Sequence, residues 1–107
     1  MLPQEEKIPR KNFSTVFKHS KTVSRGSFFI LKRQETPDFA LSVVVSKKIA
    51  KQATQRNYLK RIAYEVFAEK KRQIPTLSGS FILVFQKNPE SFNLFKTDVE
   101  KNFPLFN

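Results

Sequence analysis

The fold is decided by residues 39–86, which read FALSVVVSKKIAKQATQRNYLKRIAYEVFAEKKRQIPTLSGSFILVFQ. Apolar residues recur at every second position of Phe39–Ser46, the period of a strand with one buried face. Residues 54–72 instead carry an apolar stripe at helical spacing, made of Leu59, Ile62, Ala63, Val66 and Phe67. The run Phe-Ile-Leu-Val-Phe within Ser80–Gln86 is continuously apolar, which predicts a strand covered on both faces and therefore central. A helix between two strands predicts a βαβ unit.

The flanking sequence predicts further elements around this unit. Asn12 is the expected N-cap of a first helix that carries Phe13, Val16 and Phe17 on one face. Strands are expected near Thr22–Ser24 and over Ser27–Arg33. The turn signal Thr36-Pro37-Asp38 suggests that Ser27–Arg33 pairs with Phe39–Ser46 as a hairpin. A last helix is expected from Leu94, Phe95, Val99 and Phe103, ended by Pro104, and the expected core rings are Phe28, Phe29, Phe39, Phe67, Phe81 and Phe85.

The fold class that follows is α+β, a two-layer sandwich in the order α-β-β-β-α-β-α with helices packed on a mixed central sheet. The chain of 107 residues has the length of one domain, and residues 1–10 are expected to be flexible.

The charge of the chain points to a polyanionic partner. Lys and Arg number 20 against 9 Asp and Glu, a net charge of +11, which creates a strong positive potential on so small a body. The absence of cysteine excludes disulfides, thiolate metal sites and cysteine nucleophiles. With a single histidine, His19, we expect no catalytic side chain and no metal held by the protein. No apolar run spans a bilayer and no signal peptide is visible, so we expect a cytoplasmic protein.

The positive residues concentrate around the start of the long helix. A loop supplies three lysines, and the helix then carries basic and polar groups on the flank of its apolar stripe, near N–H groups that favour anions. Arg offers a bidentate fork to phosphate and Lys a mobile charge. The candidate RNA-binding residues are Lys47, Lys48, Lys51, Arg56, Asn57, Lys60, Arg61 and Tyr64. The alternative is an ordinary solvated helix face, which the net charge and the local concentration of lysines and arginines disfavour.

This basic segment resembles a known family. The run SKKIAKQATQRNYLKRI, residues 46–62, is similar to the signature of the bacterial ribonuclease P protein component, in which a Lys-Lys loop precedes Arg-Asn-Arg-x-Lys-Arg on a helix. Asn12–His19 also resembles the first helix of that family, and the resemblance covers about residues 9–103. Two departures are Tyr58 and Tyr64, which stand where the family usually has basic residues.

The resemblance implies a function and a mechanism. The family's partner is a catalytic RNA that removes the 5′ leader of precursor tRNA by Mg²⁺-dependent hydrolysis, with Mg²⁺ held by the RNA. The protein is implied to bind both RNAs as a monomer in a 1:1 ribonucleoprotein. A cleft for the leader is implied to contain Phe13, Phe17, Lys18 and Arg33. Spacing alone favours a core position for the two rings, and the resemblance makes the cleft equally open. The implied fold is that of the second domain of ribosomal protein S5, with a left-handed βαβ crossover.

Two other functions are open from the residues alone. A general RNA-binding or ribosome-associated protein needs the same basic surface but no leader cleft. A peripheral membrane module needs an amphipathic basic helix, but a helix between two strands should bury its apolar stripe against the sheet. A stand-alone protein nuclease is disfavoured because no paired carboxylates or histidine cluster can be assembled.

Overall fold

A computed structural model of the protein describes residues 7, 8 and 10–103, which form helices and strands in the predicted order. These elements are α1 (Arg10–His19), β1 (Lys21–Arg25), β2 (Phe29–Gln34), β3 (Phe39–Val44), α2 (Ala53–Gln73), β4 (Gly79–Phe85) and α3 (Phe92–Asn102). The long helix and the central strand therefore lie within one residue of their predicted starts and ends. The last helix forms as expected, while Pro104 and Phe106 lie outside the described residues.

The strands form one mixed sheet in the order β1-β2-β4-β3. Strand β4 is antiparallel to β2 and parallel to β3, and α2 is the crossover between the parallel pair. The predicted hairpin between β2 and β3 is therefore wrong: β2 pairs antiparallel with β1, and β4 separates β2 from β3. The physical reason is that β4 is apolar on both faces and must be covered on both. The left hand of the crossover stays a prediction of the resemblance.

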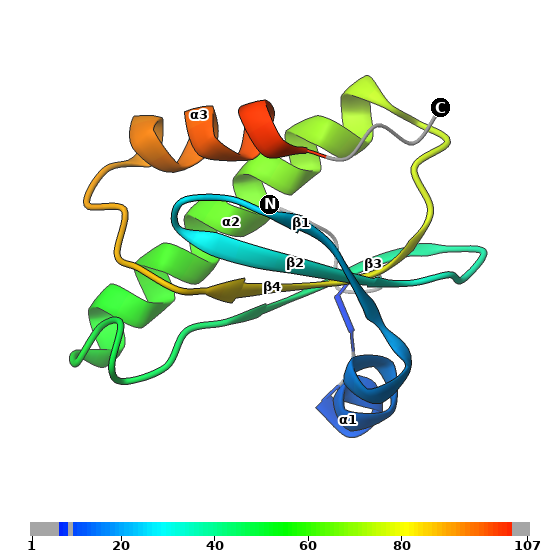
Figure 1. The fold of residues 1–107 in the computed structure, drawn as a ribbon, viewed down its shortest axis with the longest axis horizontal. Coiled ribbons are helices and arrows are strands. Elements are labelled where there is room, and N and C mark those ends of the chain that lie inside the picture. Colours follow the sequence, from blue (N-terminus) through cyan, green and yellow to red (C-terminus); the bar gives the residue numbers. More distant parts are fainter. Residues whose placement is uncertain (1–6, 9, 104–107) are drawn as a thin grey trace.

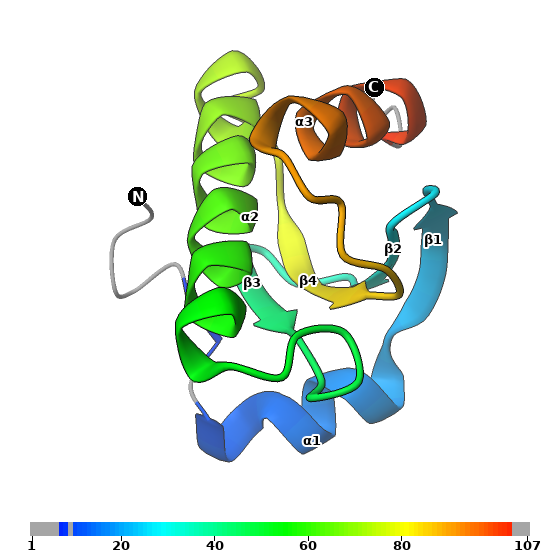
Figure 2. The same ribbon diagram turned by 90° about the vertical axis from the view of Figure 1, so that its left-hand side faces the viewer.

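The two faces of the sheet have different coverings. In Figures 1 and 2, α2 and α3 lie on one side of the sheet and α1 lies on the other. We call the side under α2 and α3 the core face, which carries Phe29, Leu31, Leu41, Phe81 and Leu83. We call the opposite side the groove face; the strand registers place Lys32, Ser42 and Ile82 together there.

The core face holds most of the buried apolar side chains. The predicted stripe of α2 is buried against it, with Ala63 and Phe67 both 0 % exposed. Phe67 lies 6.2 Å from Phe81 between ring centroids, and Phe81 lies 5.8 Å from Phe39. Aromatic pairs at this spacing stabilise a core beyond the area that they bury. Of the six rings predicted to be core, Phe28 is the exception, because it is only half-buried in the turn between β1 and β2.

A buried carboxylate joins α3 to that turn. Asp98 accepts hydrogen bonds from the backbone N–H groups of Ser27 and Phe28 at 2.9 and 3.0 Å, and from the side chain of Asn102 at 3.1 Å. Gly26 completes this contact, since a Cβ there would lie 2.4 Å from Asp98 Oδ2. The carboxylate thus satisfies backbone donors that the turn would otherwise bury unpaired.

One expectation at the N-terminus is corrected, and two residues before α1 are placed against the sheet. Asn12 lies inside α1, which begins at Arg10, so it is not the N-cap. Lys7 forms a parallel bridge with Leu41, and Ile8 N–H donates to the Leu41 carbonyl at 3.1 Å. These two residues pair with β3, because the edge of the sheet offers unpaired backbone groups, and their expected flexibility stays a prediction. The same expectation for residues 1–6 and 9 concerns positions outside those described.

Candidate nucleic-acid interface

Helix α1 presents an aromatic pair on the groove side of the sheet. The rings of Phe13 and Phe17 are stacked with centroids 5.9 Å apart and planes inclined by 29°. Val16, between them, is buried and anchors the helix, whereas Phe17 is 44 % exposed. Lys32 Nζ on β2 lies 5.2 Å from the Phe17 centroid. An exposed ring beside a cation can stack on an unpaired base while the cation meets its phosphate.

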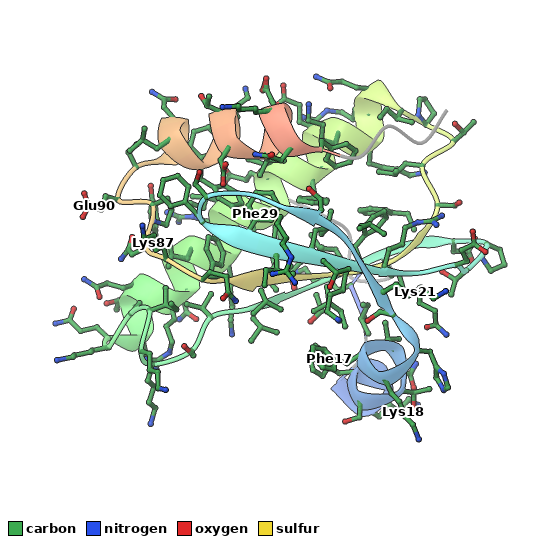
Figure 3. All side chains as sticks on the ribbon, viewed as in Figure 1. Phe17, Lys18, Lys21, Phe29, Lys87 and Glu90 are labelled. Atoms are coloured by element: carbon green, nitrogen blue, oxygen red, sulfur yellow. The ribbon has the colours of Figure 1, made fainter. Side chains whose placement is uncertain are left out.

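The predicted cleft residue Lys18 lies on the far side of this helix. Its side chain extends away from the sheet, as Figure 3 shows beside Phe17, and it is exposed. Lys18 can therefore meet a phosphate at the rim but does not line the space between α1 and the sheet.

A groove of about 550 Å³ connects α1 to α2 across the end of β3. Phe13 and Ser14 line it from α1, and Lys60 and Tyr64 line it from α2. The remaining lining residues are Ile8, Ser42, Val43, Val44 and Val45. One hollow thus joins a residue predicted for the leader cleft to two residues predicted for the basic helix.

Tyr64 is half-buried and lines this groove. Burial raises the pKa of its hydroxyl above the ordinary value of 10.0, and a hydrogen bond with the Val43 backbone only partly opposes the rise. Lys7 Nζ lies 4.8 Å from the Tyr64 centroid, which places a positive charge over the ring. Position 64 therefore holds a tyrosine in place of a basic side chain, and Lys7 supplies a positive charge beside it.

The predicted lysine loop lies directly before α2. Lys47, Lys48 and Lys51 are all exposed. The N-cap residue of α2, Gln52, makes no capping hydrogen bond with its side chain, and the first turn of the helix holds no acidic residue. The positive end of the helix and the loop lysines therefore face solvent together, an arrangement that favours anions.

The basic residues of α2 differ in what they contact. Arg56 Nη1 donates to the carbonyls of Ala50 and Lys51 at 3.0 and 2.8 Å. The guanidinium of Arg61 lies 5.6 Å from the Tyr58 centroid, and Tyr58 is 40 % exposed. Asn57 is exposed on the same outer side of the helix. The eight predicted residues thus divide between the groove (Lys60 and Tyr64) and the outer basic surface.

The structure separates Arg33 from the other predicted cleft residues. Register places it opposite Phe81 on the core face, and its Nε and Nη2 donate to the Ser78 carbonyl at 3.1 and 2.9 Å. Lys32, the preceding residue, contacts Phe17 instead. The sequence could not show which of the two faces α1, because the apolar run before them has no alternation.

Comparison with known proteins decides the family. A profile of the family described as Ribonuclease P matches residues 2–104. This chain belongs to the ribonuclease P protein family. The ribonuclease P protein component of Thermotoga maritima is 34 % identical over 84 residues, covering 78 % of this chain and 71 % of the relative. That of Lactobacillus helveticus is 31 % identical over 94 residues, covering 86 % and 75 %.

Solved structures of ribonuclease P proteins have the same fold. A Staphylococcus aureus ribonuclease P protein, a mutant described as defective in mRNA degradation, superposes with a TM-score of 0.77 at 22 % identity, covering 94 % of this chain and 92 % of that one. The protein from Thermotoga maritima gives 0.74 at 24 % identity, covering 90 % and 93 %. The function class of the chain is that of its family, a component of ribonuclease P, which matures the 5′ end of tRNA.

Among residues 7, 8 and 10–103, no three histidine, aspartate or glutamate side chains come together as metal ligands. None of the helices in that part is long and apolar enough to cross a bilayer.

Sequence reasoning missed several groups that line the interface. Ser14 and Ser42 carry no distinguishing pattern, and Lys7 lies in a segment expected to be flexible. A regular alternation of apolar and polar residues along the strand would have identified Lys32, but the residues before it are all apolar.

Proposed function

We propose that this chain binds the RNA subunit of ribonuclease P through its lysine loop and α2, and the 5′ leader of precursor tRNA through the groove beside α1. The observation that carries the proposal is the continuous groove from Phe13 on α1 to Lys60 and Tyr64 on α2. A leader strand in this groove would lie directly beside RNA held on the basic surface. The two RNAs would therefore meet on one side of the protein.

The groove has the chemistry of a single-strand site. Phe13 lines the groove and Phe17 is stacked on it, and their ring faces accept any base, which suits leaders of varied sequence. Lys60 in the groove and Lys32 beside Phe17 supply charge for the backbone phosphates. The hydroxyls of Ser14, Ser42 and Tyr64 add hydrogen-bonding groups without demanding one base.

The proposal assigns catalysis to the RNA. The described side chains form no cluster suited to hold Mg²⁺, and phosphate oxygens of the RNA are ligands that Mg²⁺ prefers. Mg²⁺ bound there would supply the activated water for hydrolysis. The protein contributes substrate affinity and electrostatic screening, as one copy for each RNA.

The test is reconstitution at low Mg²⁺ with a bacterial ribonuclease P RNA and a precursor tRNA, following leader release. The wild-type chain should stimulate cleavage, and a Lys47→Gln, Lys48→Gln, Lys51→Gln variant should stimulate much less. Arg72→Gln, an exposed residue in the last turn of α2, is the matched charge control and should behave as wild type.

Two other results would overturn parts of the proposal. Equal affinity of the ribonucleoprotein for precursor and mature tRNA would favour a general RNA-binding protein. Full cleavage by the protein without RNA would move catalysis to its side chains.

A further inference from the structure

Arg56 points back at the loop that precedes its own helix. Its Nη1 donates to the carbonyl oxygens of Ala50 and Lys51, six and five residues earlier in the chain. Its backbone N–H donates to the Gln52 carbonyl at 3.1 Å. Side chain and backbone of one residue therefore hold three consecutive carbonyls, and hydrogen bonds from a charged guanidinium are stronger than those between neutral groups.

The loop is held at its other end by a turn and by apolar packing. The N–H groups of Ile49 and Ala50 both donate to the Ser46 carbonyl, at 3.1 and 3.2 Å. Ala50 is buried at 4 % exposure, and Ile49 packs against the core. Residues 46–52 thus form a fixed arch whose inner residues are Ile49 and Ala50.

Three lysines project from this arch. Lys47, Lys48 and Lys51 are exposed and form no ion pair with any residue that the structure describes. Three like charges within five residues repel one another, so the arch needs a fixed backbone to present them together. A site held in its binding geometry also loses less conformational entropy when the ligand binds.

We infer that Arg56 is a positioning residue for RNA binding, which holds the arch so that Lys47, Lys48 and Lys51 meet phosphates together. This inference rests on the proposed function and deepens it. Arg56 acts mainly through the loop carbonyls rather than as a phosphate ligand of its own. Lysine cannot replace it, because Lys Nζ lies one bond nearer the backbone than Arg Nη1 and cannot reach both carbonyls without moving the chain.

The salt dependence of affinity for a ribonuclease P RNA counts the phosphate contacts that each variant loses. The slope of log K against log salt is negative, and each lost contact reduces its magnitude by about 0.7–0.9. Arg56→Gln should lower it by about 2, because most of the loop contacts are lost with it. Arg56→Lys should do the same although it keeps the charge. In a background of Lys47→Gln, Lys48→Gln and Lys51→Gln, Arg56→Gln should have almost no further effect.

The controls separate positioning from folding and from charge. Arg72→Gln removes one positive charge at the far end of α2 and should leave the slope unchanged. Urea unfolding and circular dichroism check that the Arg56 variants are folded. Amide hydrogen exchange of Ile49 and Ala50 should accelerate in the Arg56→Lys variant, while exchange at Leu83 in β4 should not. This comparison detects loosening of the loop within a folded protein, so it tests the inference even if Arg56→Gln is unstable.

A different set of slopes would show that Arg56 contacts a phosphate directly. A slope lowered by about 0.9 in Arg56→Gln, restored by Arg56→Lys and additive with the loop variants, makes Arg56 a phosphate ligand and overturns the inference. If the wild-type chain itself shows no salt-sensitive affinity for the RNA, the proposed function fails instead. The wild-type measurement therefore distinguishes the two failures.

Discussion

The two faces of the sheet are formed by the same strands but have different roles. On the core face, α2 and α3 cover the strands with large apolar side chains such as Phe67 and Phe95, both 0 % exposed. On the groove face, α1 is anchored by Val16 and leaves Phe17 and Lys32 accessible beside a hollow of about 550 Å³. The core face therefore provides stability and the groove face provides a binding surface.

The central place of β4 follows from its two apolar faces. Phe81 and Leu83 face the core, and Ile82, between them, is also 0 % exposed on the groove side. A strand that is apolar on both faces gives the sheet a rigid floor for the groove. Binding groups can then be placed on α1 and on the neighbouring strands with little cost to the core.

The largest effect is expected on the core face. Phe81→Ala removes a ring that contacts Phe39 and Phe67 and leaves a cavity, so the free energy of unfolding should fall by about 3–5 kcal/mol. Urea unfolding measures this change. A loss below about 1 kcal/mol would show that the core collapses around the site and is not rigid.

The contact between α3 and the β1–β2 turn is the second prediction. Asp98→Ala leaves the N–H groups of Ser27 and Phe28 without their acceptor, so the free energy of unfolding should fall by about 2–3 kcal/mol. Glu100→Ala, an exposed change on the same helix, should alter it by less than about 0.5 kcal/mol. Equal effects of the two changes would contradict the assigned role of Asp98.

The third prediction reverses the pattern on the groove face. Phe17→Ala should change unfolding less than a core substitution, since the residue is 44 % exposed, but should weaken the preference for precursor over mature tRNA about tenfold, as loss of one stacked base predicts. Leu94→Ala on α3 is the control, because Leu94 is also exposed but lies on the core side. Competition binding to the reconstituted ribonucleoprotein measures both. A large loss of stability in Phe17→Ala would instead make that ring part of the core.

The smallest effect separates two neighbours on β2. Lys32→Gln should weaken the same preference about two- to threefold, because it removes one half-buried positive charge near Phe17. Arg33→Gln should mainly lower stability, by about 1–2 kcal/mol, since its guanidinium bonds to Ser78 are lost. Paired binding and unfolding measurements on both variants check this. The reverse pattern would assign Arg33 to the groove after all.

Sequence alone determined the elements whose apolar pattern lies within one continuous segment of the chain. The stripe of α2 has five members at helical spacing, and β4 has an uninterrupted apolar run, so their positions and the central place of β4 were predictable. The basic segment was also readable, because charge and spacing stand in the residues themselves. Family membership followed from the same segment.

Only the tertiary structure decided which strands are neighbours and which side chains share a face. The turn at residues 36–38 suggested a β2–β3 hairpin, but burial of β4 on both sides places it between them. The choice of Lys32 over Arg33 for the groove depends on register, which an unbroken apolar run does not encode. The reach of Arg56 to two loop carbonyls likewise depends on how α2 and the loop lie in space, a relation that residue types do not specify.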